Sequence, residues 1–169
     1  MAEFNDIYDE NRHLTGRTHR RGARWQDGEY GLVVCVWVYD GKGNLLLTRR
    51  AKGKSFAGTW ENSGGAVQAG ETSRQAIARE LAEETGIHAE EAEFELLGSE
   101  RDNHIFYDFY CLHRDVPLTQ IVLQPGETDG VMWADFDTVH RMIRNKQICR
   151  IIARQFLRQE SRLKTKNKM

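Results

Sequence analysis

Residues 65–87, GAVQAGETSRQAIARELAEETGI, decide how this chain folds, because they contain the signals of one amphipathic helix. From Thr72 to Thr85, small and apolar residues recur at helical spacing. Thr72 or Ser73 can cap the start of the helix, and Gly86 suits the left-handed position after its last turn. The sequence therefore predicts a helix with its own start and stop signals.

Three glutamates, Glu80, Glu83 and Glu84, project from one side of this predicted helix, close to its C-terminal end. Each like-charge pair costs about 0.2–0.5 kcal/mol, and the helix dipole favours cations at this end. A solvated acidic face is the ordinary interpretation of such a cluster. However, the charge is poorly compensated within the helix, because Arg79 stands four residues before Glu83, which is the weaker order for an ion pair. A divalent cation removes the conflict, because Mg²⁺ binds carboxylate oxygens together with the phosphate oxygens of a substrate.

The spacing of the charged residues and glycines around this cluster resembles the Nudix box, G-x5-E-x7-R-E-U-x-E-E-x-G-U, in which U is aliphatic. Every fixed position is filled, by Gly65, Glu71, Arg79, Glu80, Leu81, Glu83, Glu84, Gly86 and Ile87. At ordinary residue usage, the seven fixed identities would coincide at a given start on the order of once in 10⁸. A hairpin before the box and a strand with Trp133 after it extend the resemblance over roughly residues 31–160.

The resemblance implies an α/β (α+β) Nudix fold, in which a mixed β-sheet is sandwiched between helices. It also implies hydrolysis of a nucleoside diphosphate linked to another moiety, or of a related diphosphate, with Mg²⁺ or Mn²⁺ as cofactor. By position, the metal ligands would be Glu80, Glu83, Glu84 and the carbonyl oxygen of Gly65. Glu71 and Arg79 would pair and brace the loop of the box against the helix.

Hydrolysis of a diphosphate needs charge neutralisation, an activated water molecule and a group that accepts its proton. Bound cations neutralise the phosphate oxygens and lower the pKa of a coordinated water. Glu80, Glu83 and Glu84 are candidates for the proton acceptor, because crowded acids have raised and coupled pKa values. Glu127, in QPGETDG before a predicted strand, is a further catalytic candidate, although an ordinary turn residue fits that position equally well.

Residues that contact the rest of the substrate leave weaker signals in the sequence. Lys52 and Lys54, on the loop before the box, are placed to meet a terminal phosphate. Trp60 could stack on a base, but a tryptophan beside a strand is more often part of the core. The basic segment RTHRRGAR, residues 17–24, is either a phosphate-binding element or a solvated linker.

Two other functions compete with hydrolysis. The segment YDENRHLTGRTHRRG resembles the Nudix branch that contains isopentenyl-diphosphate isomerase-like proteins. An isomerase needs a reactive cysteine before the box, whereas GTWENSGG has none, and Cys35 and Cys111 fall inside apolar strands. A domain that senses nucleotides without catalysis would have a degraded box, and this box is intact. Hydrolysis is therefore the predicted activity.

A chain of 169 residues is expected to form one domain of this type with additions at both ends. Residues 1–30 would be an extension with a small hairpin that turns near Glu10–Asn11, residues 31–163 the Nudix domain, and residues 164–169 a basic tail. Further strands are predicted over residues 31–40, 45–50, 93–100, 103–114 and 130–136, helices over 137–145 and 148–163, and a glycine-rich loop over 51–65.

Composition narrows the cellular setting and the partners. The net charge is -1, and 40% hydrophobic with 29% charged residues is ordinary for a globular protein. Three widely spaced cysteines and a polar N-terminal segment predict a cytoplasmic protein with reduced thiols. The longest apolar run, LVVCVWV, is too short to span a bilayer. We therefore expect a small-molecule diphosphate as partner, without nucleic acid or membrane, and a homodimer as an option.

Overall fold

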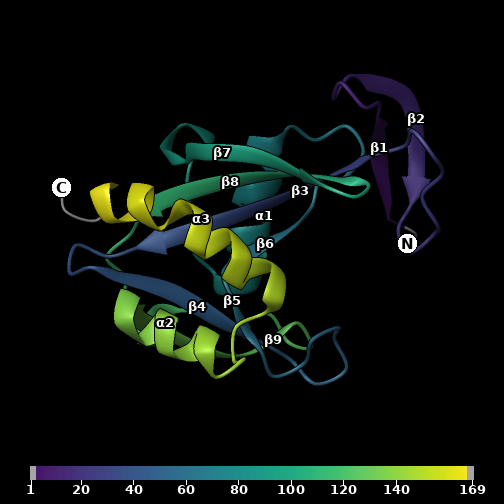
Figure 1. Cartoon of the computed structure of the whole chain (residues 1–169). Coiled ribbons are helices and arrows are strands. Elements are labelled where there is room, and N and C mark those ends of the chain that lie inside the picture. The colour runs from purple at the N-terminus through teal and green to yellow at the C-terminus, as the bar shows by residue number, and fades with distance from the viewer. Residues whose placement is uncertain (1–2, 167–169) are drawn as a thin grey trace.

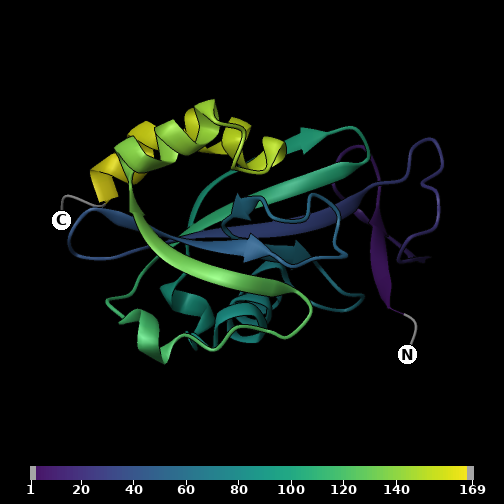
Figure 2. The same cartoon turned by 90° about the horizontal axis from the view of Figure 1, so that it is seen from below.

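The computed structural model describes residues 3–166 and shows a β-sheet with helices on both faces (Figure 1). The strands are β1 (Phe4–Tyr8), β2 (Leu14–Arg20), β3 (Gly31–Tyr39), β4 (Asn44–Arg50), β5 (Trp60–Glu61), β6 (Ser63–Ala66), β7 (Glu95–Asp102), β8 (Ile105–His113) and β9 (Thr128–Asp135). The helices are α1 (Ser73–Thr85), α2 (Phe136–Arg144) and α3 (Arg150–Lys166), with short 3₁₀ helices at Glu91–Glu93 and Leu118–Gln120. Helix α1 covers one face of the sheet, and α2 and α3 cover the other (Figure 2).

Strand β3 is central because three other strands pair with it. It runs parallel to β8, from the pair Gly31–Ile105 to the pair Tyr39–His113, and antiparallel to β6 and β4. The antiparallel pairs β4–β5, β4–β9 and β7–β8 complete the sheet. Strands β3 and β4 pair near their turn, at Tyr39 and Leu45, and then diverge (Figure 1). The predicted mixed sheet sandwiched between helices is confirmed.

The nearly continuous apolar run of β3 is explained by its burial on both faces. On one face, Trp37 packs against Phe156 of α3, with the ring centroids 5.6 Å apart. On the other face, Val34 belongs to a cluster that contains Ile77 and Leu81 of α1. These two clusters fix α1 and α3 on opposite sides of the same strand.

Helix α1 begins and ends close to where the sequence predicts. The side chain of Thr72 accepts a hydrogen bond from the backbone N–H of Gln75 at 3.1 Å, and the side chain of Gln75 accepts one from the N–H of Thr72 at 2.9 Å. Gly86 follows with a φ of 71°, and its N–H donates to the carbonyl oxygen of Ala82. Both caps fix the register of the helix, and so they fix where the glutamates of its last turns lie.

Two segments differ from the prediction. The expected loop over residues 51–65 contains β5 and the start of β6, because long-range pairing with β4 and β3 imposes strands on residues without local periodicity. Helix α3 continues to Lys166, so residues 164–166 are helical, and residues 167–169 of the predicted tail lie outside the described residues. Lys166 pairs with Glu95 of β7 at 2.5 Å, which holds the end of the helix on the sheet.

None of the helices within residues 3–166 has the length and apolar character needed to cross a membrane.

Strands β1 and β2 form an antiparallel hairpin whose turn contains Glu10 and Asn11, as predicted, and it stands at one end of the sheet (Figure 1). The hairpin is attached to the loop between β6 and α1, which is part of the Nudix box motif. Three hydrogen bonds make this attachment: Asn5 Nδ2 to the Val67 carbonyl at 2.7 Å, Ala69 N–H to the Phe4 carbonyl at 2.9 Å, and Gly70 N–H to Asp6 Oδ2 at 2.8 Å.

Asp108 of β8 makes a second attachment between the hairpin and the sheet. Its buried carboxylate accepts hydrogen bonds from Arg12 at 2.5 Å, and from the hydroxyl groups of Ser73 and Ser99 at 2.6 Å each. Burial alone would raise the pKa of Asp108, but the three hydrogen bonds outweigh it and the pKa is lowered. The ionised carboxylate therefore stabilises the folded state.

Replacing Asp108 by asparagine is expected to lower the free energy of unfolding by about 1–3 kcal/mol near neutral pH, since Arg12 loses its charged partner. The folded pKa lies below the unfolded value of about 3.9, so the contribution is complete above that value and is lost as pH falls through the folded pKa. Urea unfolding should show that wild type and Asp108→Asn converge at acidic pH. The exposed Asp115→Asn is the control, and a difference independent of pH would contradict the role of the charge.

Candidate active site

A cavity of about 370 Å³ lies between α1, β6 and the start of α3. Glu80, Glu83 and Glu84 of α1, with Gly64 and Gly65 of β6, line one side of it, which we call the acidic wall. A Cβ atom at Gly65 would lie less than 3.0 Å from the Glu80 carboxylate, so this carboxylate fills the space of a side chain. The N–H of Gly64 donates to Glu84 at 3.3 Å. The predicted metal-binding residues thus face one cavity.

Arg79 connects the loop of the box to the acidic wall. Its guanidinium donates to both carboxylate oxygens of Glu71, at 2.7 and 2.9 Å, and to the carbonyl oxygen of Ala66 at 3.3 Å. The third nitrogen contacts Glu80 at 2.8 Å and Glu83 at 3.2 Å. Hydrogen bonding to Glu71 is the main cause of the raised pKa of Arg79. The predicted pair of Glu71 and Arg79 is present and holds the loop against the helix.

Burial, together with the like charges that the sequence places side by side, raises the pKa values of two carboxyl groups in the acidic wall. Burial raises the pKa of Glu84 to about 8, and the negative charges of Glu80 and Glu61 add to the effect. Burial also raises the pKa of Glu80, although the positive charge of Arg79 opposes the shift. Ionised carboxylates at these positions are therefore unfavourable unless a cation lies beside them.

The acidic wall offers the oxygen donors that a hard divalent cation prefers, namely three carboxylates and the carbonyl oxygen of Gly65. Within residues 3–166, no three side chains of His, Cys, Asp or Glu are already arranged around a common metal position. In this arrangement Glu80 and Glu83 contact Arg79 instead. The donor types fit Mg²⁺ or Mn²⁺, and Glu80 and Glu83 each contact Arg79 through one carboxylate oxygen, so a second oxygen of each remains as a donor for an ion.

Basic side chains also line the cavity, and each is paired with a carboxylate that lines it too. The pairs are Arg21 with Glu3, Arg50 with Glu61 at 2.6 Å, and Lys54 with Glu127. The sequence predicts Lys54 and Glu127 as site residues, and Arg21 lies in the basic segment that is either a phosphate-binding element or a solvated linker. Arg50, Glu61 and Glu3 were missed, because the strand pairing and hairpin position that bring them here leave no local signal.

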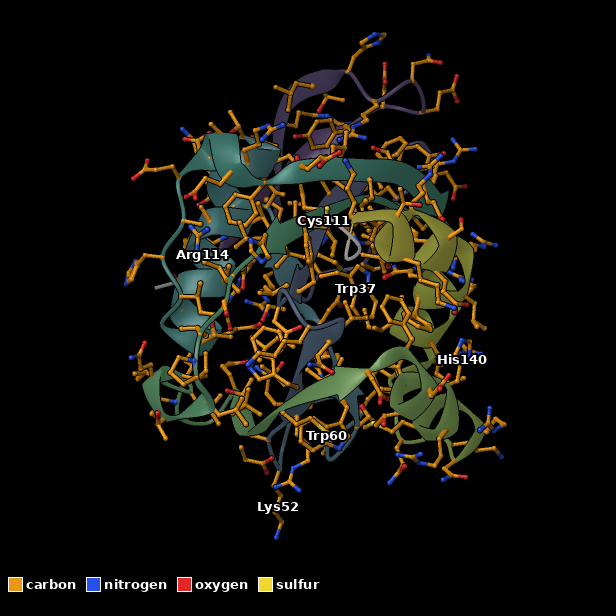
Figure 3. The ribbon with its side chains drawn as sticks, turned by 90° about the vertical axis from the view of Figure 1, so that its left-hand side faces the viewer. Trp37, Lys52, Trp60, Cys111, Arg114 and His140 are labelled. Atoms are coloured by element: carbon orange, nitrogen blue, oxygen red, sulfur yellow. The ribbon has the colours of Figure 1, made fainter. Side chains whose placement is uncertain are left out.

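Two residues predicted to contact the substrate, Lys52 and Trp60, do not line the cavity. Lys52 is exposed and extends into solvent from the tip of its loop (Figure 3). Trp60 is directed to the core by strand β5, where it packs against the cluster that contains Trp37. Arg49 lies over the Trp60 ring, 5.7 Å from its centroid. The lining of the cavity therefore gives no support to their predicted contacts with a phosphate and a base.

The remainder of the cavity is mainly apolar. Its apolar lining residues are Val33, Cys35, Phe56, Ala66, Tyr107, Cys149, Ile151 and Ile152, and the polar side chains of Ser55, Gln68 and Gln124 line it too. Burial strongly raises the pKa of Cys35, so its thiol is protonated and unreactive. The buried amide of Asn62 also lines the cavity, and it has no hydrogen-bond partner among residues 3–166. The cavity thus joins the acidic wall to a mainly apolar side that also carries uncharged polar groups.

Comparison with known proteins shows to which protein family the chain belongs. The family model of the NUDIX domain matches residues 29–155. The chain belongs to the Nudix hydrolase family. This Nudix hydrolase is 37% identical over 129 residues to a Nudix hydrolase of Listeria monocytogenes, covering 75% of the chain and 76% of the relative. It is 32% identical over 102 residues to the CTP pyrophosphohydrolase of Escherichia coli, covering 60% of the chain and 74% of the relative.

Solved structures agree on the fold of this Nudix hydrolase. The crystal structure of DR0079 from Deinococcus radiodurans superposes with a TM-score of 0.79 at 23% identity, covering 93% of this chain and 99% of that one. A bifunctional NMN adenylyltransferase/ADP ribose pyrophosphatase from Francisella tularensis, complexed with AMP and Mn, gives a TM-score of 0.65 at 16% identity, covering 83% and 43%. The resemblance drawn from the box is confirmed, and pyrophosphohydrolase activity follows from the family.

Proposed function

We propose that this Nudix hydrolase cleaves the diphosphate linkage of a nucleoside diphosphate derivative or related compound, with Mg²⁺ or Mn²⁺ as cofactor. The acidic wall carries the proposal, because three glutamates of one helix face a single cavity beside Gly65. A nucleotide is the favoured substrate class, since the relative from Escherichia coli is a CTP pyrophosphohydrolase. The apolar side of the cavity offers room for the group attached to the diphosphate.

Each part of the acidic wall has a role in this proposal. Glu80, Glu83, Glu84 and the carbonyl oxygen of Gly65 would hold the cation. When bound, the cation neutralises the diphosphate oxygens and lowers the pKa of the attacking water. Arg79, through its contacts with Glu71, keeps the glycine loop and the helix at a fixed separation.

A carboxylate within hydrogen-bond reach of the attacking water has to accept its proton. The cavity provides two sources: a glutamate of α1 and Glu127, which is paired with Lys54 on the neighbouring loop. Both lie in the same cavity as the proposed cation ligands. Exchange of the Lys54 contact for a substrate phosphate would free Glu127 for this role.

A panel of nucleoside triphosphates, nucleotide sugars and dinucleotides tests the proposal. We expect products cleaved at a diphosphate linkage with Mg²⁺ or Mn²⁺, detected by chromatography, and no product after addition of a chelator. Compounds that raise the melting temperature but yield no product at any metal concentration would support a nucleotide sensor instead.

Isopentenyl diphosphate belongs in the same panel as a test of the isomerase alternative. The structure gives no support to that alternative, because the cysteine nearest the glycine loop, Cys35, has a buried and protonated thiol. Formation of an isomerised diphosphate would contradict the hydrolytic proposal. Unchanged isopentenyl diphosphate is the expected result.

A further inference from the structure

We infer that the N-terminal hairpin forms part of the active site, and that Arg21 binds a phosphate group of the substrate in competition with Glu3. This inference rests on the proposed function. The NUDIX family model begins at residue 29, so the hairpin lies outside the matched domain. Nevertheless, both Glu3 and Arg21 line the cavity that contains the acidic wall. A segment added to the domain therefore contributes charged groups to its site.

The position of Arg21 relative to the acidic wall is well defined. The hairpin is joined to residues 67–70 by the three hydrogen bonds described above, and to β8 by Arg12 and Asp108. Arg21 follows β2 directly, and its N–H donates to the carbonyl oxygen of Glu3 at 2.9 Å. Its charge is close enough to interact favourably with Glu80. The hairpin that carries Arg21 is thus joined to the loop that directly follows β6 and Gly65.

Arg21 is the most available of the three arginines that line the cavity in the described part of the chain. Its side chain is 60% exposed, whereas those of Arg50 and Arg79 are 24% and 21% exposed. Arg79 is engaged by Glu71 and two carboxylates of the acidic wall. Arg21, by contrast, has one ion-pair partner among residues 3–166, and that partner is itself 48% exposed. Such an exposed pair is weak and exchanges readily.

A phosphate is a better partner for Arg21 than Glu3 is. A guanidinium donates two parallel hydrogen bonds to phosphate oxygens, and a phosphate group carries more charge than a carboxylate. The carboxylates of the acidic wall would be neutralised by the cation when substrate is bound. The guanidinium of Arg21 then binds the substrate phosphate. In the free protein, Glu3 competes with the phosphate because it forms an ion pair with this guanidinium.

Steady-state kinetics with the best substrate of the panel provide the test. Arg21→Gln should raise KM about tenfold with kcat changed less than about twofold, because a uniform binding contact is removed. Glu3→Gln should have the opposite effect and lower KM about two- to fivefold, since the competitor is lost. Added to Arg21→Gln, Glu3→Gln should change KM no further. A purely structural ion pair would not give opposite signs for its two members.

Arg20→Gln is the matched control, because Arg20 precedes Arg21, is exposed, and lies outside the cavity. Calorimetry with imidodiphosphate and Mg²⁺ measures binding without turnover and should show the same order of affinities. If the panel yields no product, the proposed function fails and the calorimetry alone decides the inference. If Arg21→Gln matches Arg20→Gln in KM and in imidodiphosphate affinity, the inference is overturned while the hydrolase function stands.

Discussion

Replacing Glu83 by glutamine is expected to lower kcat/KM by at least about a hundredfold and to leave the fold intact. Loss of a group that supports a metal ligand already costs about 10–100-fold, and Glu83 is proposed to be a ligand itself. The fold should survive because Glu83 is exposed and its contact with Arg79, at 3.2 Å, is the longest ion pair that Arg79 makes. Its removal also relieves repulsion with Glu80.

Turnover measured over a range of Mg²⁺ concentrations, together with thermal unfolding, checks this prediction. We expect an unchanged melting temperature without metal and a loss of activity that higher Mg²⁺ only partly restores. Glu91→Gln, an exposed glutamate outside the cavity, provides the matched control. Near-normal turnover of Glu83→Gln at low Mg²⁺ would show that Glu83 is not a metal ligand.

Alanine at the two neighbouring glycines of β6 should produce two different defects. At Gly65, a Cβ would displace the Glu80 carboxylate, the end of a flexible side chain, so activity should fall at least about tenfold while stability changes little. At Gly64, a Cβ would lie less than 3.0 Å from backbone atoms of Val34 and Cys35, which cannot move without breaking the pairing of β3. Gly64→Ala should therefore cost about 3 kcal/mol or more.

The two alanine variants act as controls for each other, since the substitution is the same and the positions are adjacent. Urea unfolding should rank Gly64→Ala far below wild type and Gly65→Ala near it. Assays at a temperature where both remain folded should then show a specific loss in Gly65→Ala. Equal stabilities for the two variants would contradict the close backbone contact at Gly64, and full activity of Gly65→Ala would contradict the role of Glu80.

The fold could be predicted wherever a local pattern coincides with tertiary burial. Helix α1 has both caps within its own sequence, and the run of β3 is apolar because it is buried on both faces. Strands β5 and β6 escaped prediction because glycines and polar residues there are held by pairing with distant strands. The end of α3 escaped because Lys166 is held by Glu95, a contact between residues far apart in the chain.

The residues of the candidate site also fall into those that the sequence could predict and those that it could not. The acidic wall and the pair of Glu71 and Arg79 could be predicted, because one helix and its loop carry all of these residues in a fixed spacing. Lys52 and Trp60 were assigned by nearness in sequence, but side-chain direction in a loop depends on its turns and on strand pairing. Arg21 could not be placed, since the hairpin packs against the box through contacts that no periodicity records.

The parallel pairing of β3 with β8 has a consequence for the way the chain is made. Residues 32–38, LVVCVWV, are uncharged and rich in β-branched residues, and such segments aggregate when they are exposed. On a growing chain β4 and β6 follow early, but the strand that pairs with all of residues 31–39 exists only after Ile105 and the rest of β8 are made. Long-range parallel pairing also forms slowly. The most apolar strand is therefore the segment most in need of protection while the protein is being synthesised.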